Sequence, residues 1–205
     1  MPAVVDPCSR LVVISGPSGA GKSTVVRELL VSCPLPLHLS VSATTRQPRR
    51  GEVEGEDYFF LSPEQFALRR AAGEFLECKE YAGNWYGTLQ SQVSAGLAEG
   101  KWVLLEIDVE GTMAVLEKHP DALTIFVHSG SVEELERRLR LRNTESEEAL
   151  ARRLATARRE LSQKGRYRYE VVNLDVRQAV KEVCEILLRH ANCQDTARES
   201  PCSKH

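Results

Sequence analysis

A glycine-rich run that ends in lysine and serine lies close to the start of the chain. Residues 16–23 read Gly-Pro-Ser-Gly-Ala-Gly-Lys-Ser and fit G-x-x-x-x-G-K-[ST], the pattern of a phosphate-binding loop. Glycines permit backbone conformations that other residues avoid, so the loop N–H groups can point inward around a triphosphate. Lys22 is expected to hold the β- and γ-phosphates, and the Ser23 hydroxyl to hold Mg²⁺. The loop therefore predicts binding of ATP or a related nucleotide.

The segments on either side of the loop are those needed to position it. Residues 10–15 are an apolar, β-branched run typical of a buried strand, and residues 23–32 follow an amphipathic helical pattern that stops before Pro34. This helix directs the positive end of its dipole at the bound phosphates. The expected triphosphate site comprises Gly16, Pro17, Ser18, Gly19, Ala20, Gly21, Lys22, Ser23 and Thr24.

Composition limits the remaining possibilities. The chain has 205 residues, 42% of them hydrophobic and 27% charged, which is ordinary for one well-packed globular domain. A net charge of −2 predicts no general attraction to nucleic acid or membrane. Without a long apolar run or a signal-peptide pattern, a cytoplasmic protein is expected, either a monomer or a homo-oligomer.

The six cysteines form no C-x-x-C pair, so free thiols are expected. One arrangement leaves an alternative open, because His190-x-x-Cys193 is mirrored by Cys202-x-x-His205 near the end of the chain. Four such ligands can close a tetrahedral zinc site. A polar C-terminus in which these residues fall by chance is the other interpretation.

Strand-like and helix-like segments alternate along the chain. Strands are predicted at 10–15, 37–42, 102–107, 123–128 and 170–173. Helices are predicted at 23–32, 63–72, 89–99, 110–118, 131–142, 146–162 and 176–190. Strands that are apolar throughout are buried on both faces, as in a parallel sheet covered by helices. The predicted fold class is therefore α/β, a P-loop three-layer sandwich with a parallel five-stranded core sheet.

Two charged segments interrupt this core pattern. Residues 40–88 are rich in Arg, Glu, Gly and Tyr and predict a small mixed β/α insert, and residues 131–168 predict a polar hairpin of two helices. We expect one domain over residues 10–192, preceded by a flexible N-terminus at 1–9 and followed by a polar tail at 193–205. Its core would comprise 10–39, 89–130 and 169–192.

Several further motifs follow the loop in order. They are the segment from Ser40 to Tyr58, Glu77, the segment Gly83-Asn-Trp-Tyr-Gly-Thr88, the segment Glu106-Ile-Asp-Val-Glu-Gly111, the segment Arg142–Glu148, and the pair Val172-Asn173. In this order and spacing the chain resembles the guanylate kinase family from about residue 10 to residue 188. The resemblance implies transfer of the γ-phosphoryl group of ATP to GMP with Mg²⁺, giving ADP and GDP, as in the recycling of GMP in purine nucleotide metabolism. It makes the insert the GMP-binding part and the helical hairpin a lid over ATP.

The residues assigned by this resemblance suit the chemistry of GMP. Guanine presents N1–H and N2–H₂ donors along one edge, which the carboxylates of Glu77 and Asp108 can accept. Planar guanidinium groups match phosphate oxygens, so Arg46 and Arg49 are expected at the GMP phosphate. The full implied set is Ser42, Arg46, Arg49, Tyr58, Glu77, Tyr86, Gly87, Thr88 and Asp108.

Phosphoryl transfer also needs positive charge around the moving group. By resemblance the catalytic residues are Lys22, Arg46, Arg138, Arg142 and Arg153. Glu106 is assigned to the outer shell of Mg²⁺ beside Ser23, and Asn173 to the neighbourhood of the ATP base. Asn143 and Leu174 depart from the family pattern, which affects expectations for the lid turn and the adenine contacts.

Two alternatives to this function remain at the level of sequence. One is another P-loop small-molecule kinase, acting on a sugar phosphate or a different nucleoside monophosphate. The other is a non-catalytic guanylate-kinase-like module that binds phosphorylated peptide segments. The complete phosphate loop and the presence of Ser42, Glu77, Thr88 and Asp108 favour the kinase for GMP.

Overall fold

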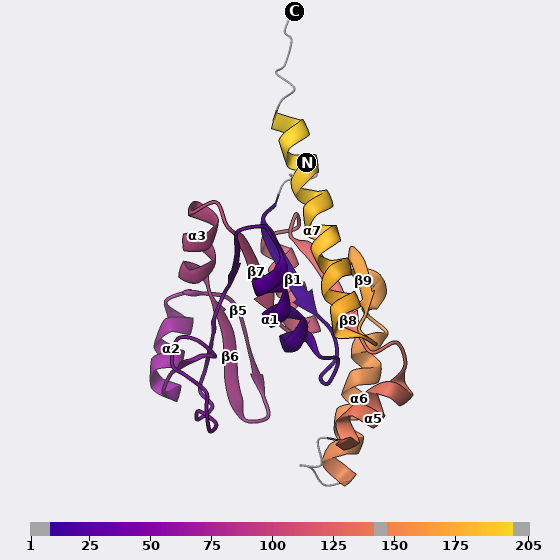
Figure 1. Ribbon diagram of the computed structural model, residues 1–205. Coiled ribbons are helices and arrows are strands. Elements are labelled where there is room, and N and C mark those ends of the chain that lie inside the picture. Colours follow the sequence, from indigo (N-terminus) through magenta and orange to yellow (C-terminus); the bar gives the residue numbers. More distant parts are fainter. Residues whose placement is uncertain (1–8, 142–146, 199–205) are drawn as a thin grey trace, which may run out of the picture.

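The computed structural model describes residues 9–141 and 147–198, and its core is a five-stranded parallel sheet (Figure 1). The order of its strands is β2-β7-β1-β8-β9. Their bounds are β1 Leu11–Ser15, β2 Leu37–Leu39, β7 Trp102–Glu106, β8 Leu123–His128 and β9 Tyr169–Val172. The predicted parallel five-stranded sheet is confirmed.

Helices cover both faces of this sheet. They are α1 Lys22–Ser32, α3 Gln90–Ala98, α4 Val109–Lys118 and α7 Val176–Arg198. Alternate residues of β1 point to opposite faces: Val12 and Ile14 pack with α1 and α7, whereas Leu11 and Val13 pack with α3 and α4. Both sets are almost fully buried, which explains why the strand is apolar at every position.

The GMP-binding insert of the sequence analysis contains a second sheet with its own small core. Its strand order is β4-β3-β6-β5, with β3 and β4 parallel and the other pairs antiparallel. The bounds are β3 Ser42–Thr44, β4 Phe59–Phe60, β5 Phe75–Tyr81, β6 Asn84–Leu89 and α2 Pro63–Ala71. Phe66 of α2 stacks on Phe75 with their ring centroids 4.4 Å apart, which anchors the helix to this sheet.

The helical hairpin consists of α5 Val132–Leu141 and α6 Glu147–Leu161, followed by a short 3₁₀ turn, η1 Lys164–Arg166. Leu135 and Leu139 of α5 pack with Leu154 and Ala157 of α6 in a separate apolar cluster. Figure 1 shows the insert and this hairpin on opposite sides of the core. A site between them would therefore be lined by residues of the insert, the hairpin and the core.

Two predicted elements have bounds that differ from those of the structure by more than one residue. The expected strand 37–42 is divided: Ser40 N–H still bonds to Leu104 O of β7, but Ser42 pairs with Thr88 in the other sheet. The chain thus passes from one sheet to the other within three residues. The hydrophobic pattern of the segment does not predict this change. The last helix continues past residue 190 to Arg198, because no proline or glycine interrupts it before Pro201.

None of the helices in the described ranges is long and apolar enough to cross a membrane.

Candidate active site

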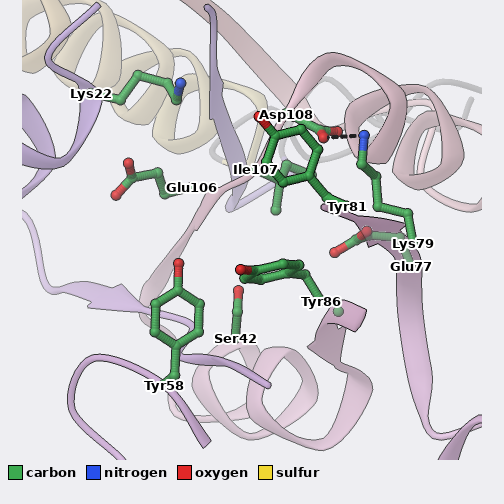
Figure 2. Close-up of a pocket in the computed structure, with 11 residues that line it drawn as sticks. Lys22, Ser42, Tyr58, Glu77, Lys79, Tyr81, Tyr86, Glu106, Ile107 and Asp108 are labelled. Atoms are coloured by element: carbon green, nitrogen blue, oxygen red, sulfur yellow. Dashed lines mark ion pairs between the residues drawn. The ribbon is translucent and has the colours of Figure 1, made fainter. Parts of the chain in front are cut away.

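A cavity of about 290 Å³ lies where the phosphate loop, the end of β7 and the second sheet meet (Figure 2). Lys22 and Glu106 border one side, and Glu77, Lys79 and Asp108 border the other. The remaining lining residues are Ser42, Tyr58, Tyr81, Tyr86, Gly87 and Ile107. A lysine that can bind phosphate groups and carboxylates that can accept hydrogen bonds from the edge of a base therefore line the same cavity.

The phosphate loop has the backbone that its glycines predict. Gly16, Gly19 and Gly21 have φ angles of 142°, 92° and 86°, in the region where only glycine is unstrained. A Cβ atom on Gly16 would also lie 1.9 Å from Val127 O of β8. The loop is thus wrapped against the sheet too closely for any side chain at this position.

Lys22 and Ser23 begin α1 and face the end of β7. The Lys22 Nζ atom donates to Gly16 O at 2.6 Å and to Pro17 O at 3.2 Å, so the ammonium folds over its own loop. Burial lowers the pKa of Lys22, while the charges of Glu106, Glu160 and Asp108 act to raise it. Ser23 Oγ donates to Glu106 Oε1 at 2.6 Å. This pair of oxygen groups at the strand end is suited to a hard cation such as Mg²⁺.

Glu77 is the most buried carboxylate of the cavity, with 9% of its surface exposed. Its Oε1 atom accepts from Thr88 N at 3.0 Å and from Thr88 Oγ1 at 2.7 Å. Burial raises the pKa of Glu77, and the nearby charge of Asp108 acts in the same direction, while the bonds from Thr88 oppose them. Thr88 therefore supports Glu77 from behind and is not itself among the lining residues.

Asp108 follows the end of β7 and caps the N-terminus of α4. Its Oδ1 atom accepts from Gly111 N at 2.9 Å, and the positive end of the helix dipole favours its charge. Gly111 allows this approach: a Cβ atom there would lie 3.1 Å from Glu77 Oε2 and 3.4 Å from Asp108 Oδ1. The two carboxylates thus converge on the same point of α4.

A neighbouring hollow of about 460 Å³ shares Ser42, Tyr58 and Glu106 with the cavity and is also lined by Arg46 and Arg49. The Arg46 guanidinium makes a bidentate pair with Glu52, at 2.9 Å from Nη1 to Oε2 and 2.8 Å from Nη2 to Oε1. The hydrogen bond to Glu52 raises the pKa of Arg46. The sequence analysis missed Glu52, which neutralises an arginine expected to bind phosphate.

Tyr58 and Tyr86 lie edge to face with their ring centroids 6.0 Å apart. The Arg46 guanidinium carbon lies 5.3 Å from the centroid of Tyr58. Burial raises the pKa of Tyr58, so its hydroxyl stays protonated and available as a donor at neutral pH. Two tyrosine hydroxyls and two arginines therefore surround the region between the cavity and the hollow.

The helical hairpin rests directly on the phosphate loop. Arg153 Nη2 of α6 donates to Ser18 Oγ at 2.7 Å, and the Glu160 carboxylate accepts from the backbone N–H of Ser18. A Cβ atom on Gly19 would lie 2.8 Å from Leu139 Cδ2 of α5, so both helices touch the loop. The sequence analysis predicted Arg153 but missed its contact with Ser18 and the role of Glu160.

The other predicted ATP residues occupy different places. Arg138 pairs with Glu134 at 2.7 Å and reaches Leu174 O at 3.5 Å. Asn173 is buried beneath the loop, where its Nδ2 atom donates to Ala20 O at 2.8 Å. Thr24 borders a groove between α1 and α7. Arg142 and Asn143 lie outside the described residues.

Lys79, Tyr81 and Ile107 line the cavity, although the sequence analysis did not assign them. A signal was present for Lys79, because it lies two residues after Glu77 in a strand and thus shares its face. Ile107 likewise separates Glu106 from Asp108. Their positions relative to the cavity depend on how β5 packs against α4.

The zinc alternative rests on residues that the structure describes only in part. His190 is buried, and its ring lies edge to face with Trp102 at 6.0 Å between centroids. The side chain of Cys193, and all of Cys202 and His205, lie outside the described part of the structure. Among the described residues no group of three or more His, Cys, Asp or Glu side chains is arranged to hold a metal ion.

Comparisons with known proteins agree with this arrangement. The family model described as guanylate kinase matches residues 8–190. The chain is 58% identical to the guanylate kinase of Rhodopirellula baltica, covering 96% of this chain and 92% of that protein. It is 52% identical to the guanylate kinase of Rubrobacter xylanophilus, covering 88% and 94%. The crystal structure of guanylate kinase from Anaplasma phagocytophilum superposes with a TM-score of 0.74 at 31% identity, covering 91% of this chain and 88% of that one.

Proposed function

The chain belongs to the guanylate kinase family and has its activity, transfer of a phosphoryl group from ATP to GMP, and we propose how the described residues perform it. The observation that supports the proposal is the shared cavity, in which Lys22 of the phosphate loop faces Glu77 and Asp108. Donor and acceptor phosphates can meet there without crossing bulk water.

On the ATP side, the proposal assigns the loop N–H groups and Lys22 to the triphosphate. Lys22 now donates to two loop carbonyls, and these bonds can be exchanged for phosphate oxygens without moving the backbone. Arg138 and Arg153, with Arg142, are proposed to neutralise charge on the transferring group. Thr24 and Asn173 are proposed to lie at the ATP site, where the bond from Asn173 to Ala20 O fixes the loop from below.

On the GMP side, Glu77 and Asp108 are proposed to accept the N1–H and N2–H₂ donors of guanine. Adenine presents an N1 lone pair at the same position, which a carboxylate repels. Hydrogen-bonding sites of this kind can discriminate by about 10⁴-fold, because a mismatched base leaves buried polar groups unpaired. Ser42 and Gly87 line the same cavity beside the carboxylates, and Thr88 holds Glu77 in place.

The GMP phosphate is proposed to bind between Arg46, Arg49 and the hydroxyls of Tyr58 and Tyr86. The bidentate pair of Arg46 with Glu52 keeps the guanidinium in its planar, forked orientation before substrate arrives. The acceptor phosphate is already an anion, so no strong general base is required. The work of the site is to align the two phosphates in line and to neutralise their repulsion.

Mg²⁺ is proposed as the cofactor, with the Ser23 hydroxyl as a ligand and Glu106 acting through its waters. The two oxygen atoms are 2.6 Å apart at the strand end, and oxygen donors are the ligands that this ion prefers. When bound, the ion supplies positive charge between the phosphates of ATP.

We further propose that residues 40–88 and 131–168 close over the two substrates and exclude water. They are the insert and the lid of a single domain spanning residues 10–192. The contacts of Ser18 and Gly19 with the helical hairpin support the lid assignment, since they tie it to the ATP loop.

The decisive experiment compares ADP release with GMP, AMP, UMP and CMP as acceptors. GMP is expected to be preferred by several orders of magnitude. Equal turnover of AMP would refute the assignment of Glu77 and Asp108 to the base.

A further inference from the structure

Among the described residues that line the cavity, Lys79 is a cation to which the proposed mechanism assigns no task. It lies on β5 two residues after Glu77, so both side chains leave the same face of the strand. Its ammonium forms an ion pair with Asp108 Oδ2 (Figure 2), and a second ion pair with Glu110 Oε2 at 3.0 Å. A cation thus lies beside the two carboxylates that are proposed to read guanine.

A nearby cation favours the ionised form of a buried carboxylate. Burial raises the pKa of Glu77, and the nearby charge of Asp108 acts in the same direction. The hydrogen bonds from Thr88 oppose this rise, and the charge of Lys79 adds a smaller lowering contribution. Ionised Glu77 offers only acceptors to the N1–H and N2–H₂ donors of guanine, whereas its protonated form carries a donor of its own.

The two ion pairs of Lys79 differ in their surroundings. Glu110 is 83% exposed, so its pair is screened by water and contributes little. Asp108 is 32% exposed and Lys79 26%, and the second oxygen of Asp108 is already fixed by Gly111 N. With both oxygens held, the Asp108 carboxylate has one orientation. Burial disfavours the ammonium, yet the bonds to Asp108 and Glu110 raise the pKa of Lys79.

We propose that Lys79 is a positioning and specificity residue of the GMP site, which orients the Asp108 carboxylate toward guanine and favours the ionised form of Glu77. This inference rests on the proposed function, because it assigns a role to the same base-reading site. The charged groups that face Lys79 come from β5, the start of α4 and α6. They are Glu77, Asp108, Glu110 and Glu160, and the Tyr81 ring centroid lies 5.9 Å from the ammonium.

The test is the pH dependence of GMP binding in Lys79→Met, measured by calorimetry without ATP from pH 5 to 9. Methionine keeps an unbranched apolar stem and removes the charge. The pH below which GMP affinity falls is expected to rise, so that affinity near the acid limb drops about two- to threefold. At pH 9 the loss should be smaller, because Glu77 is then ionised in either protein.

Three further variants separate this role from a purely structural one. Lys79→Arg retains the charge and a planar fork for carboxylates, and is expected to restore the wild-type profile. Glu110→Gln removes only the exposed ion-pair partner of Lys79 and should leave the pH dependence of GMP affinity unchanged. In a Glu77→Gln background the pH-dependent part of the effect of Lys79→Met should disappear, since the titrating carboxylate is gone.

The outcomes are distinguishable from a failure of the proposed function. Wild-type protein that does not prefer GMP over AMP would refute the function itself. If GMP is preferred but Lys79→Met and wild type give parallel pH profiles, the assignment of Lys79 is overturned. If Lys79→Met unfolds at a different temperature from the wild type, Lys79→Gln is measured in its place, and the same shift of the pH profile is expected.

Discussion

The contact between Ser18 and Arg153 predicts that the Ser18 hydroxyl is one of the groups that hold the proposed lid on the phosphate loop. Arg153 Nη2 lies 2.7 Å from Ser18 Oγ, and the arginine belongs to α6 while the serine belongs to the loop. A hydrogen bond from a charged donor contributes about 1.5–3 kcal/mol. Because the bond is only partly buried, we take the lower value, which corresponds to a factor of about ten in an equilibrium.

Ser18→Ala should therefore reduce the population of the docked hairpin about tenfold relative to the undocked one. Amide hydrogen exchange in the ligand-free protein should then accelerate by a similar factor within α6, and not in the core strands. The kcat/KM for ATP is expected to fall by up to about tenfold, since Arg153 must then be repositioned during each turnover.

Ser18→Thr is the matched control, because threonine keeps a hydroxyl at the same position. It should retain wild-type exchange and most of the activity. Unchanged hydrogen exchange in α6 and an unchanged kcat/KM in Ser18→Ala would refute the role of this hydrogen bond. If both variants lose activity equally, the effect comes from the loop backbone and not from the hydroxyl.

Three other substitutions and a change of pH test the remaining parts of the site. Lys22→Ala is expected to reduce turnover on the order of 10³-fold with an unchanged circular dichroism spectrum, because the charge on the β- and γ-phosphates is lost; ADP release near the wild-type rate would contradict this. Glu77→Gln should narrow the preference for GMP over AMP by about 10- to 100-fold in competition assays, since a carboxamide also donates; unaltered discrimination would remove Glu77 from the base site. The KM for GMP should rise as the pH is lowered through the raised pKa of Glu77, hence above the value of 4.5 for an ordinary glutamate, while the KM for ATP does not follow it. Arg142→Ala should lower kcat more than ATP affinity in steady-state and binding measurements, and an equal loss in both would argue against a role in the transition state.

The phosphate loop could be predicted from the sequence because its function is local. Eight consecutive residues set the φ angles, direct the N–H groups and place Lys22 and Ser23 on the first turn of α1. The parallel sheet was also predictable, because strands buried on both faces must be apolar at every position. The motif order added the GMP residues through their resemblance to a family.

Other features depend on contacts between segments far apart in the chain. The 37–42 segment changes sheets because β7 and β6 each offer a free edge to part of it, and no local pattern records that competition. The docking of α6 on Ser18 spans 135 positions in sequence.

The sequence by itself determined which groups are present: a phosphate loop, two carboxylates for a base and arginines for phosphates. Only the tertiary structure decided that Lys79 joins those carboxylates, because the packing of β5 against α4 brings the ammonium to Asp108. Ionisation of buried groups depends on distance and exposure, and both are properties of the packed chain.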